Sequence, residues 1–283
     1  MFAGFTQRLN FGMGNGGGGT VSVPSAFPTR PISQLGNFNT FAINFITAAN
    51  ITDPNQVSAI NQLSNDLVNT GLMNKMYAIY PMVGGNATSH SLNLKDPRDA
   101  NSAYRLTFSG GMTHSSTGVQ FGGVNGNANT WFNPSFFGVN NNCHMSFYSR
   151  TLNSTTGYDF AWSNSILIIC NYGPQSQAYG GFGTLISVAN TNTRGLFVNN
   201  SLTNVALFRN GSQITNTTAA TFNPNTVSQA MNLTLGSDVR PGAIEFSTKE
   251  CAFASIGQGL TTAEHQTFYT IVQTYQTLLG RQV

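Results

Sequence analysis

The sequence contains few charged residues. Only 12 Lys and Arg and 9 Asp and Glu occur among 283 residues, which is 7% of the chain, whereas charged residues make up about a quarter of an average globular protein. The net charge is +3, but the cations are scattered singly along the chain. Because binding to a phosphate backbone needs clustered cations that release counterions together, we expect no nucleic-acid partner.

The sequence also lacks a long apolar run. The longest one, residues 166–170, reads ILIIC, which is far short of the roughly 20 residues that a membrane-spanning helix needs. It suits a buried strand instead. The first residues contain no apolar core of a signal peptide. We therefore expect no membrane segment and no secretion by the usual signal.

Cysteine is scarce, with only Cys143, Cys170 and Cys251 in the chain. These residues are far apart, they form no CxxC pair, and their number is odd. This pattern predicts free, buried thiols in a protein made in a reducing compartment. The 21 Phe, 9 Tyr and 2 Trp residues argue against intrinsic disorder, because disordered chains are poor in aromatic residues.

Neutral polar side chains take the place of the missing charges. A surface of amides and hydroxyls has little charge repulsion to keep molecules apart. This composition favours a protein that assembles densely with sister subunits or other proteins, and we expect a homo-oligomer.

The composition divides the chain into three segments. Residues 1–35 are rich in Gly and Pro and predict an extended arm, held by its own domain or, as we prefer, by a neighbouring subunit. Residues 36–93 predict a helical segment and linker. Residues 94–283 predict a β domain that ends in a helix.

Two helices are indicated by apolar spacing and capping residues. The first begins at Asp53-Pro54, an N-cap followed by proline at the first helical position. The second begins after Thr261, has Glu264 in its first turn and ends near Gly280. Both patterns are amphipathic, so each helix should cover a sheet or another helix with one face.

Many short alternating runs with turn residues between them predict strands of a sandwich or jelly roll. The Asn210-Gly211 pair supplies the positive φ angles of a tight hairpin turn. The runs that we interpret as strands are residues 104–108, 144–148, 184–188, 205–208, 231–235 and 243–246.

The C-terminal part of the sequence combines the 205–214 hairpin, a late strand at residues 251–256, the segment Gly257-Gln258-Gly259-Leu260-Thr261 and the final helix with Glu264. This order of elements resembles concanavalin A-like (laminin G-like) jelly-roll domains. It spans residues 94–283. It implies a β-sandwich fold that serves lectins, glycosidases and adhesion modules alike.

A narrower resemblance rests on three segments, residues 94–99 (LKDPRD), 105–111 (RLTFSGG) and 113–115 (THS). These segments resemble parts of proteins of tailed bacteriophages, several of them virion-associated. This resemblance implies a location in the virion, for a protein made in the host bacterial cytoplasm, with other virion proteins as partners.

The sequence shows no catalytic apparatus. The E-x-D-x-E arrangement of the family's endoglucanases is absent. Glu245 and Glu250 have an odd spacing along the sequence, which places them on opposite faces if one strand carries both. We expect these acids to be solvated or paired with Lys249 or Arg240. The four histidines are isolated, with no helical i,i+4 pair for zinc. We expect no enzyme, no metal and no cofactor.

The densest charge lies in the segment Lys95-Asp96-Pro97-Arg98-Asp99. A calcium site needs six to eight oxygen ligands, and no loop spacing here supplies them. We therefore expect Asp96 or Asp99 to cap a turn and to pair with Arg98 or Arg105.

A carbohydrate-binding surface is the alternative function. Sugar rings are held by aromatic faces together with amide hydrogen bonds. The segment 171–181 supplies both, with Tyr172 and Tyr179 as candidate ligand-binding residues, and Trp131 and Trp162 could add platforms. The alternative for the tryptophans is burial in the core, and the tyrosine loop could instead contact a neighbouring subunit.

The sequence thus predicts a mainly β, concanavalin A-like jelly-roll protein that acts as a structural component of a bacteriophage virion. Head decoration, neck and tail fibre are the positions we consider, with docking through the N-terminal arm. The alternative is a receptor-recognition module that binds bacterial surface glycan during host adsorption. A depolymerising glycosidase is a third possibility, and it would need two acids in one groove.

Overall fold

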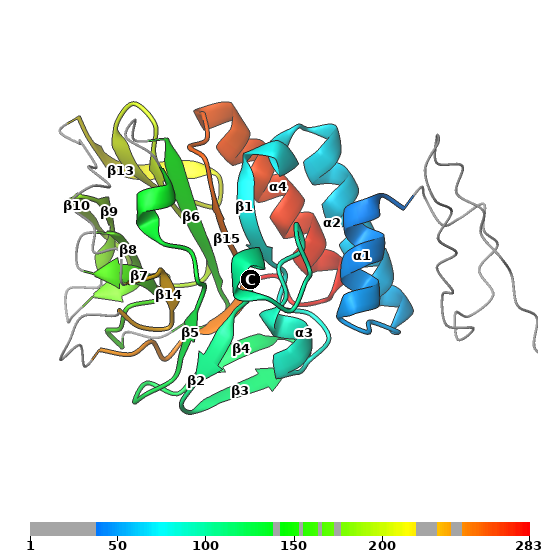
Figure 1. The fold of residues 1–283 in the computed structure, drawn as a ribbon. Helices are drawn as coiled ribbons and strands as arrows, with labels where there is room; N and C mark the ends of the chain where they lie inside the picture. Colours follow the sequence, from blue (N-terminus) through cyan, green and yellow to red (C-terminus); the bar gives the residue numbers. More distant parts are fainter. Residues whose placement is uncertain are drawn as a thin grey trace, which may run out of the picture.

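The computed structural model describes residues 38–137, 142–152, 155–163, 166–172, 177–218, 231–238 and 245–283. The expected arm at residues 1–35 lies outside the described residues. Three layers follow one another in space: a group of helices, a first β-sheet and a second β-sheet (Figure 1). The strands within each sheet pair in antiparallel fashion, so the fold is a mainly β sandwich, as the sequence predicts.

The first sheet has the strand order β13-β12-β11-β6-β15-β4-β3, and β1 also pairs with β15. One edge of β15 pairs with β6, while its other edge pairs with β4 at its start and with β1 at its end. The bounds are β1 Met76–Tyr80, β3 Met112–Ser115, β4 Gly118–Phe121, β6 Cys143–Ser149, β11 Gly195–Ser201, β12 Val205–Arg209, β13 Ser212–Thr217 and β15 Glu250–Gly257.

The second sheet has the strand order β10-β9-β8-β7-β14-β5-β2. Its bounds are β2 Thr107–Ser109, β5 Asn127–Asn129, β7 Phe160–Ser163, β8 Ile166–Tyr172, β9 Gln177–Phe182, β10 Thr184–Ala189 and β14 Thr234–Leu235.

A hydrophobic core fills the space between the two sheets. It includes Phe121, Phe147 and Phe197 from the first sheet and Phe160 and Phe182 from the second, each at most 1% exposed. Alternate residues of each strand contribute to this core, because successive side chains in a strand point to opposite faces. The two sheets are therefore held together chiefly by aromatic and aliphatic burial.

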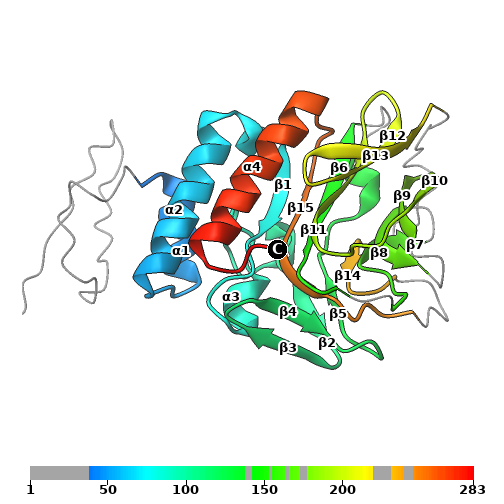
Figure 2. The same cartoon turned by 180° about the vertical axis from the view of Figure 1, so that it is seen from behind.

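Helices cover the other face of the first sheet (Figure 2). The helix α1 (Thr40–Ala48) lies on α2 (Pro54–Asn69), and α2 lies on α4 (Thr262–Leu278). Short helices connect the remaining elements: α3 (Ala87–Ser91), η2 (Leu72–Lys75), η3 (Asn101–Ala103) and η4 (Pro134–Phe137). A second apolar cluster joins the helices to the sheet through residues such as Leu63 of α2, Phe268 of α4 and Phe253 of β15.

The helix starts follow the sequence signals. The side chain of Asp53 accepts a hydrogen bond from the Gln56 N–H with Pro54 at the first position, and Thr261 and Glu264 form a reciprocal capping box. These caps satisfy N–H groups that have no partner within the helix. The structure adds α1 and the short α3, so within the described residues three α-helices instead of one precede the predicted β domain.

Residues 38–93 are built into the sandwich. The sequence predicts a helical segment and linker over residues 36–93, but β1 is a strand of the first sheet and α1 and α2 share a core with α4. The described part of this segment thus completes the first sheet and its helical cover.

Three strand predictions need correction. Tyr104 has a φ of 58° and ends η3, so β2 begins only at Thr107 instead of at residue 104. The predicted strand 231–235 is reduced to β14, two residues long. Of the predicted strand 243–246, residues 243 and 244 lie outside the described residues, and Phe246 forms only isolated bridges.

The Asn210-Gly211 hairpin and the three thiols agree with the sequence predictions. Asn210 and Gly211 have φ angles of 50° and 77° between β12 and β13. All three cysteines are free and buried.

Within the described residues, no helix combines the length and the apolar character that crossing a membrane would require.

Candidate functional site

The exposed face of the second sheet carries a pair of tyrosines. Tyr172 ends β8, and Tyr179 lies in the neighbouring strand β9. Their ring centroids are 4.9 Å apart and the rings meet edge to face at 61°. Such a pair is a preferred aromatic geometry, so each ring fixes the orientation of the other.

A register irregularity brings the two rings together. Ile166, Ile168 and Cys170 belong to the core between the sheets, while Leu167 and Ile169 lie on the opposite face. Strict alternation would point Tyr172 toward the core. The pairing shifts between Ile169, opposite Tyr179, and Tyr172, opposite Gln177, and this shift allows Tyr172 to contact Tyr179 on the outer side.

The two rings differ in their exposure. Tyr172 is 39% exposed, whereas Tyr179 is half-buried and packs on the cluster of Tyr158, Ala161, Leu167 and Ile169. The Tyr179 hydroxyl donates a hydrogen bond to the Gln177 side-chain oxygen over 2.9 Å. Tyr179 and Gln177 therefore form a supported base, and Tyr172 presents the accessible ring.

Small side chains of β10 flank this pair. Ser187 lies opposite Tyr179, and Ala189 lies opposite Gln177; both are exposed. Cross-strand partners point to the same side of a sheet, so short side chains leave the tyrosine edge open. The exposed Leu185 continues this face. We call Tyr172, Gln177, Tyr179, Ser187 and Ala189 the tyrosine platform.

The tyrosine platform is uncharged. The strands β8, β9 and β10 contain no Asp, Glu, Lys or Arg. The surface offers aromatic carbon, hydroxyl and amide groups, a set that suits a neutral polar ligand better than an ion.

The tryptophans lie elsewhere. Trp131 follows β5 near the other edge of the sheet, and its indole N–H donates to the Thr107 hydroxyl over 2.8 Å. Trp162 of β7 packs against the core between the sheets. The structure thus brings together Tyr172 and Tyr179 of the four predicted residues and does not bring Trp131 or Trp162 to them. Successive side chains of β7 point to opposite faces of the sheet. Because Ala161 lies on the outer face, its neighbour Trp162 points toward the core.

Most of the described acids have structural partners. Asp96 pairs with Arg98 and Asp99 with Arg105, as the sequence predicts. Glu264 pairs with Lys75 over 2.6 Å. Glu250 pairs with Arg150 over 2.7 Å and not with Lys249, one of the two partners considered from sequence. The other, Arg240, lies outside the described residues. Within the described residues, no group of three or more His, Cys, Asp and Glu side chains is arranged to hold a metal ion.

Two polar contacts escape sequence reasoning. His90 and His114 lie side by side, and the fully buried Lys249 faces the fully buried Asp159. Both contacts join residues far apart in the chain, where no local pattern links them. The one local signal is the placement of Lys249 just before a buried strand, where an unpaired charge would be costly.

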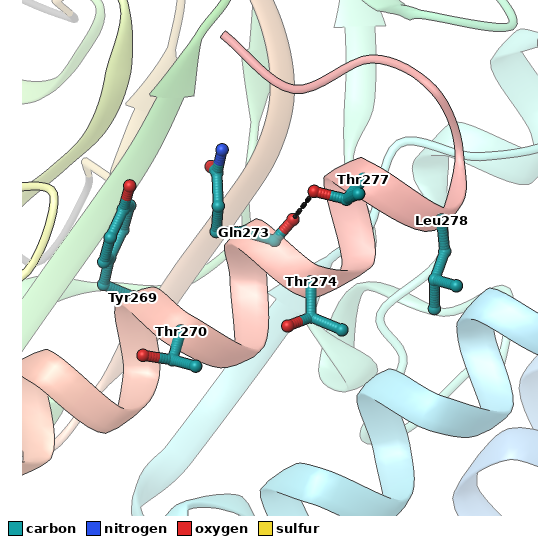
Figure 3. A pocket seen from close by; sticks show the side chains of 6 residues that line it. All are labelled: Tyr269, Thr270, Gln273, Thr274, Thr277 and Leu278. Carbon is teal, nitrogen blue, oxygen red and sulfur yellow. Dashed lines mark hydrogen bonds between the residues drawn. The ribbon is translucent and has the colours of Figure 1, made fainter.

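A shallow hollow on α4 is a weaker candidate. Its volume is about 300 Å³, and Tyr269, Thr270, Gln273, Thr274, Thr277 and Leu278 line it (Figure 3). The hydroxyls of Thr270 and Thr277 donate to carbonyls one turn earlier in the same helix. They are thus already engaged, and no titrating catalytic group other than the Tyr269 phenol lines the hollow.

Comparisons with known proteins show the fold. No protein-family profile matches the chain, and no curated protein matches it. A mutant of Trypanosoma rangeli sialidase with trans-sialidase activity matches with a TM-score of 0.52 at 11% identity, over 84% of this chain and 38% of that chain.

Two further structures are similar at a lower level. Domain 4 of an extracellular arabinanase from Geobacillus stearothermophilus matches with a TM-score of 0.44 at 12% identity, over 69% of this chain and 98% of that chain. A botulinum neurotoxin type C structure matches with a TM-score of 0.46 at 11% identity, over 72% of this chain and 53% of that chain. The chain spans little more than a third of the sialidase and about half of the neurotoxin chain. At 11% identity the sialidase likeness supports the β-sandwich fold and nothing finer.

Proposed function

We propose that the protein is a carbohydrate-binding module and that the tyrosine platform is its binding surface. The observation that carries this proposal is the edge-to-face contact of Tyr172 and Tyr179 on an exposed sheet face. A sugar ring presents C–H groups on one side, which pack on an aromatic face, and hydroxyls at its rim, which bond to amides and hydroxyls. Gln177 and Ser187 place such groups beside the rings.

The ligand that we propose is a neutral glycan of a bacterial surface. The absence of charged side chains from β8, β9 and β10 leaves no ion-pair partner for a carboxylate or sulfate on these strands. One aromatic ring is the main contact, so we expect weak binding to a single site and tighter attachment when several copies bind together.

Glycan-array binding and calorimetry test this proposal. Tyr172→Ala should weaken binding about tenfold, equivalent to about 1.4 kcal/mol, because it removes the exposed ring. Tyr172→Phe should retain most of the affinity, since the ring face remains. Phe136→Ala is the matched control, because Phe136 is 59% exposed and packs edge to face on Phe132 at a different place. A silent array, or equal loss in the Phe136 variant, would exclude the platform as a glycan site.

We propose further that the module does not catalyse. Asp96, Asp99, Glu250 and Glu264 are each held by a cation, and Asp53 caps a helix. Glycoside hydrolysis needs two carboxyl groups that are free to act on one bond. Incubation with bacterial capsule should release no reducing sugar, and reproducible release would overturn this part of the proposal.

A second candidate function is that of a bacteriophage virion component, with the glycan module serving host adsorption. The resemblance of residues 94–99, 105–111 and 113–115 to phage proteins and the neutral composition favour it. In this role the residue 1–35 arm would dock on other virion proteins or on a sister subunit. Sedimentation analysis should show a homo-oligomer that dissociates when residues 1–35 are deleted, and a monomer at every concentration would argue against it.

A further inference from the structure

Lys249 and Asp159 form an ion pair that is completely removed from solvent. Both side chains are 0% exposed, and Nζ of Lys249 lies 3.6 Å from Oδ1 of Asp159. The other ion pairs of the described residues have side chains between 16% and 74% exposed. Lys249 stands just before β15 of the first sheet and Asp159 just before β7 of the second, so the pair bridges the two layers.

The backbone holds both residues in place. The Asp159 N–H donates to the Ile168 carbonyl, and the Asp159 carbonyl accepts from the Gly236 N–H. The Lys249 carbonyl accepts from the Phe121 N–H, and the Lys249 N–H donates to the Ser247 hydroxyl oxygen. The two side chains are thus presented to each other by fixed strands.

The hydrogen bonds at the carboxylate distinguish its two oxygens. Oδ2 accepts from the Cys170 backbone N–H over 2.7 Å, and Oδ1 accepts from the Ser247 hydroxyl over 2.5 Å. Nζ of Lys249 donates to the Thr155 carbonyl over 3.0 Å. The oxygen nearer to Lys249 is therefore the one beside a hydroxyl, and the other oxygen faces a backbone donor.

The attraction between the two buried charges offsets little of the free energy that it costs to remove them from water. Removing two charges from water costs several kcal/mol per ion, and the attraction offsets this only when the geometry is close. A charge-assisted N–H···O bond is about 2.7–2.9 Å long, whereas this pair is at 3.6 Å. A neutral link between the two residues would remove both buried charges.

We propose that Lys249 and Asp159 condense to an isopeptide bond that joins the two sheets covalently. In the first step a proton passes from the Lys249 ammonium to Oδ1 of Asp159, which leaves a neutral amine and a neutral carboxylic acid. The Nζ lone pair attacks Cγ, and the new N–C bond forms. Negative charge develops on Oδ2, where the Cys170 N–H stabilises it as a fixed donor does in an oxyanion hole.

The bond from Cγ to Oδ1 then breaks. Oδ1 takes a second proton from the nitrogen, for which the Ser247 hydroxyl is the adjacent relay, and leaves as water. One amine and one carboxylic acid become one amide and one water molecule. No oxidant, reductant or further reactant is needed, and the fixed approach of the two groups supplies the effective concentration.

Solvent exposure distinguishes the Lys75–Glu264 ion pair from the Lys249–Asp159 pair. Lys75 and Glu264 approach more closely, at 2.6 Å, but both are 29% exposed. Solvent stabilises the two charges of that pair, so it lacks the complete burial that sets Lys249 and Asp159 apart. The Lys75–Glu264 pair therefore serves as an internal control.

Intact-mass measurement of the full chain under denaturing conditions tests the proposal. We expect a mass one water molecule below that of the sequence. Lys249→Met should restore the full sequence mass, and Lys249→Arg should do so while keeping a cation beside Asp159. Lys75→Met should keep the water loss. If the Lys249 variants fail to fold, the wild-type mass and the peptide map below decide the matter alone.

Tryptic peptides locate the bond. Trypsin does not cleave after an acylated lysine, and Arg240 is followed by proline, so the linked protein should give residues 151–194 joined to residues 210–281. The unlinked protein would give 210–249 and 250–281 as separate peptides. A wild-type chain with the full sequence mass and these separate peptides would overturn the proposal. The mass and the peptide map do not depend on glycan binding, so they test the isopeptide bond separately from the proposed function.

Discussion

The Nδ1 atoms of His90 and His114 lie 3.0 Å apart. One ring must donate and the other accept, so the contact requires that at least one ring is neutral. His90 lies on α3 and is fully buried. Burial is the main reason that the pKa of His90 is lowered to about 3, and the charges of His114 and Arg281 add to the effect.

Acid should destabilise the protein through its buried histidines. The pKa values of His90 and His265 are lowered to about 3 and that of His144 to about 4, mainly by burial. In the unfolded chain each returns to about 6.5, so the unfolded state binds more protons below that pH. The stability that depends on these neutral histidines is therefore fully present above pH 6.5. It is lost as the pH falls toward the pKa values of the folded state.

Urea titrations between pH 7 and pH 5 measure this loss. Each of the three histidines should contribute up to about 1.4 kcal/mol per pH unit to the decrease in the free energy of unfolding. Ordinary carboxylates stay largely ionised in this range, so they contribute little. His90→Gln should reduce the slope of the free energy of unfolding against pH by the equivalent of about one proton. A free energy of unfolding that does not change with pH would contradict the role of the buried histidines.

The Arg281 guanidinium should be a major stabilising group. It is 1% exposed and donates to the carbonyls of Pro81, Met82 and Ala252 and to the Gln276 side chain. Arg281→Ala leaves these buried acceptors without partners, each at a cost of about 1–3 kcal/mol. We expect a loss of about 3 kcal/mol or more in urea unfolding. Arg98→Ala is the control, because that side chain is 67% exposed, and it should cost far less than Arg281→Ala.

The elements that local signals specify were predictable from the sequence. Asp53-Pro54, the Thr261 and Glu264 capping box and Asn210-Gly211 each depend on residues within a few positions, and the structure places a helix start or a turn at all three. The strands β6, β10 and β12 likewise follow from alternation, and β15 was expected from the resemblance of the C-terminal segments. The sandwich follows because such strands must bury one face.

The parts that depend on distant contacts were not predictable. The positive φ of Tyr104 ends a short helix where alternation suggests a strand. The contact of Tyr172 with Tyr179 depends on a register shift between β8 and β9, which strict alternation does not reveal. Tyr172 and Tyr179 were found as candidates by residue type, whereas the positions of Trp131 and Trp162 required the sheet itself.

Gly211→Ala should destabilise the β12–β13 hairpin. Gly211 has a φ of 77°, and a Cβ there would lie 3.1 Å from the Cβ of Tyr269 on α4. The left-handed conformation alone costs about 1–2 kcal/mol for a residue with a side chain, and the contact adds to that cost. Gly71→Ala is a matched control, because Gly71 has a φ of 75° with no atom within 4 Å of the added Cβ.

Comparison of the two glycine variants by thermal and urea unfolding separates strain from crowding. Both should be less stable than the wild type, and Gly211→Ala should be the less stable of the two. Equal losses would mean that α4 moves away from the turn at no cost.

The three cysteines should react with a thiol reagent only when the protein opens. Cys143, Cys170 and Cys251 are all fully buried, and burial raises the pKa of each thiol above its usual value. The thiolate is the reactive form, so both access and ionisation are suppressed in the folded state.

Ellman's reagent at pH 8 should modify none of the three cysteines in native buffer and all three in concentrated urea. Because all three lie in the core between the sheets, their reaction rates at intermediate urea report separation of the sheets. Rapid modification of any thiol in native buffer would show that this core opens without global unfolding.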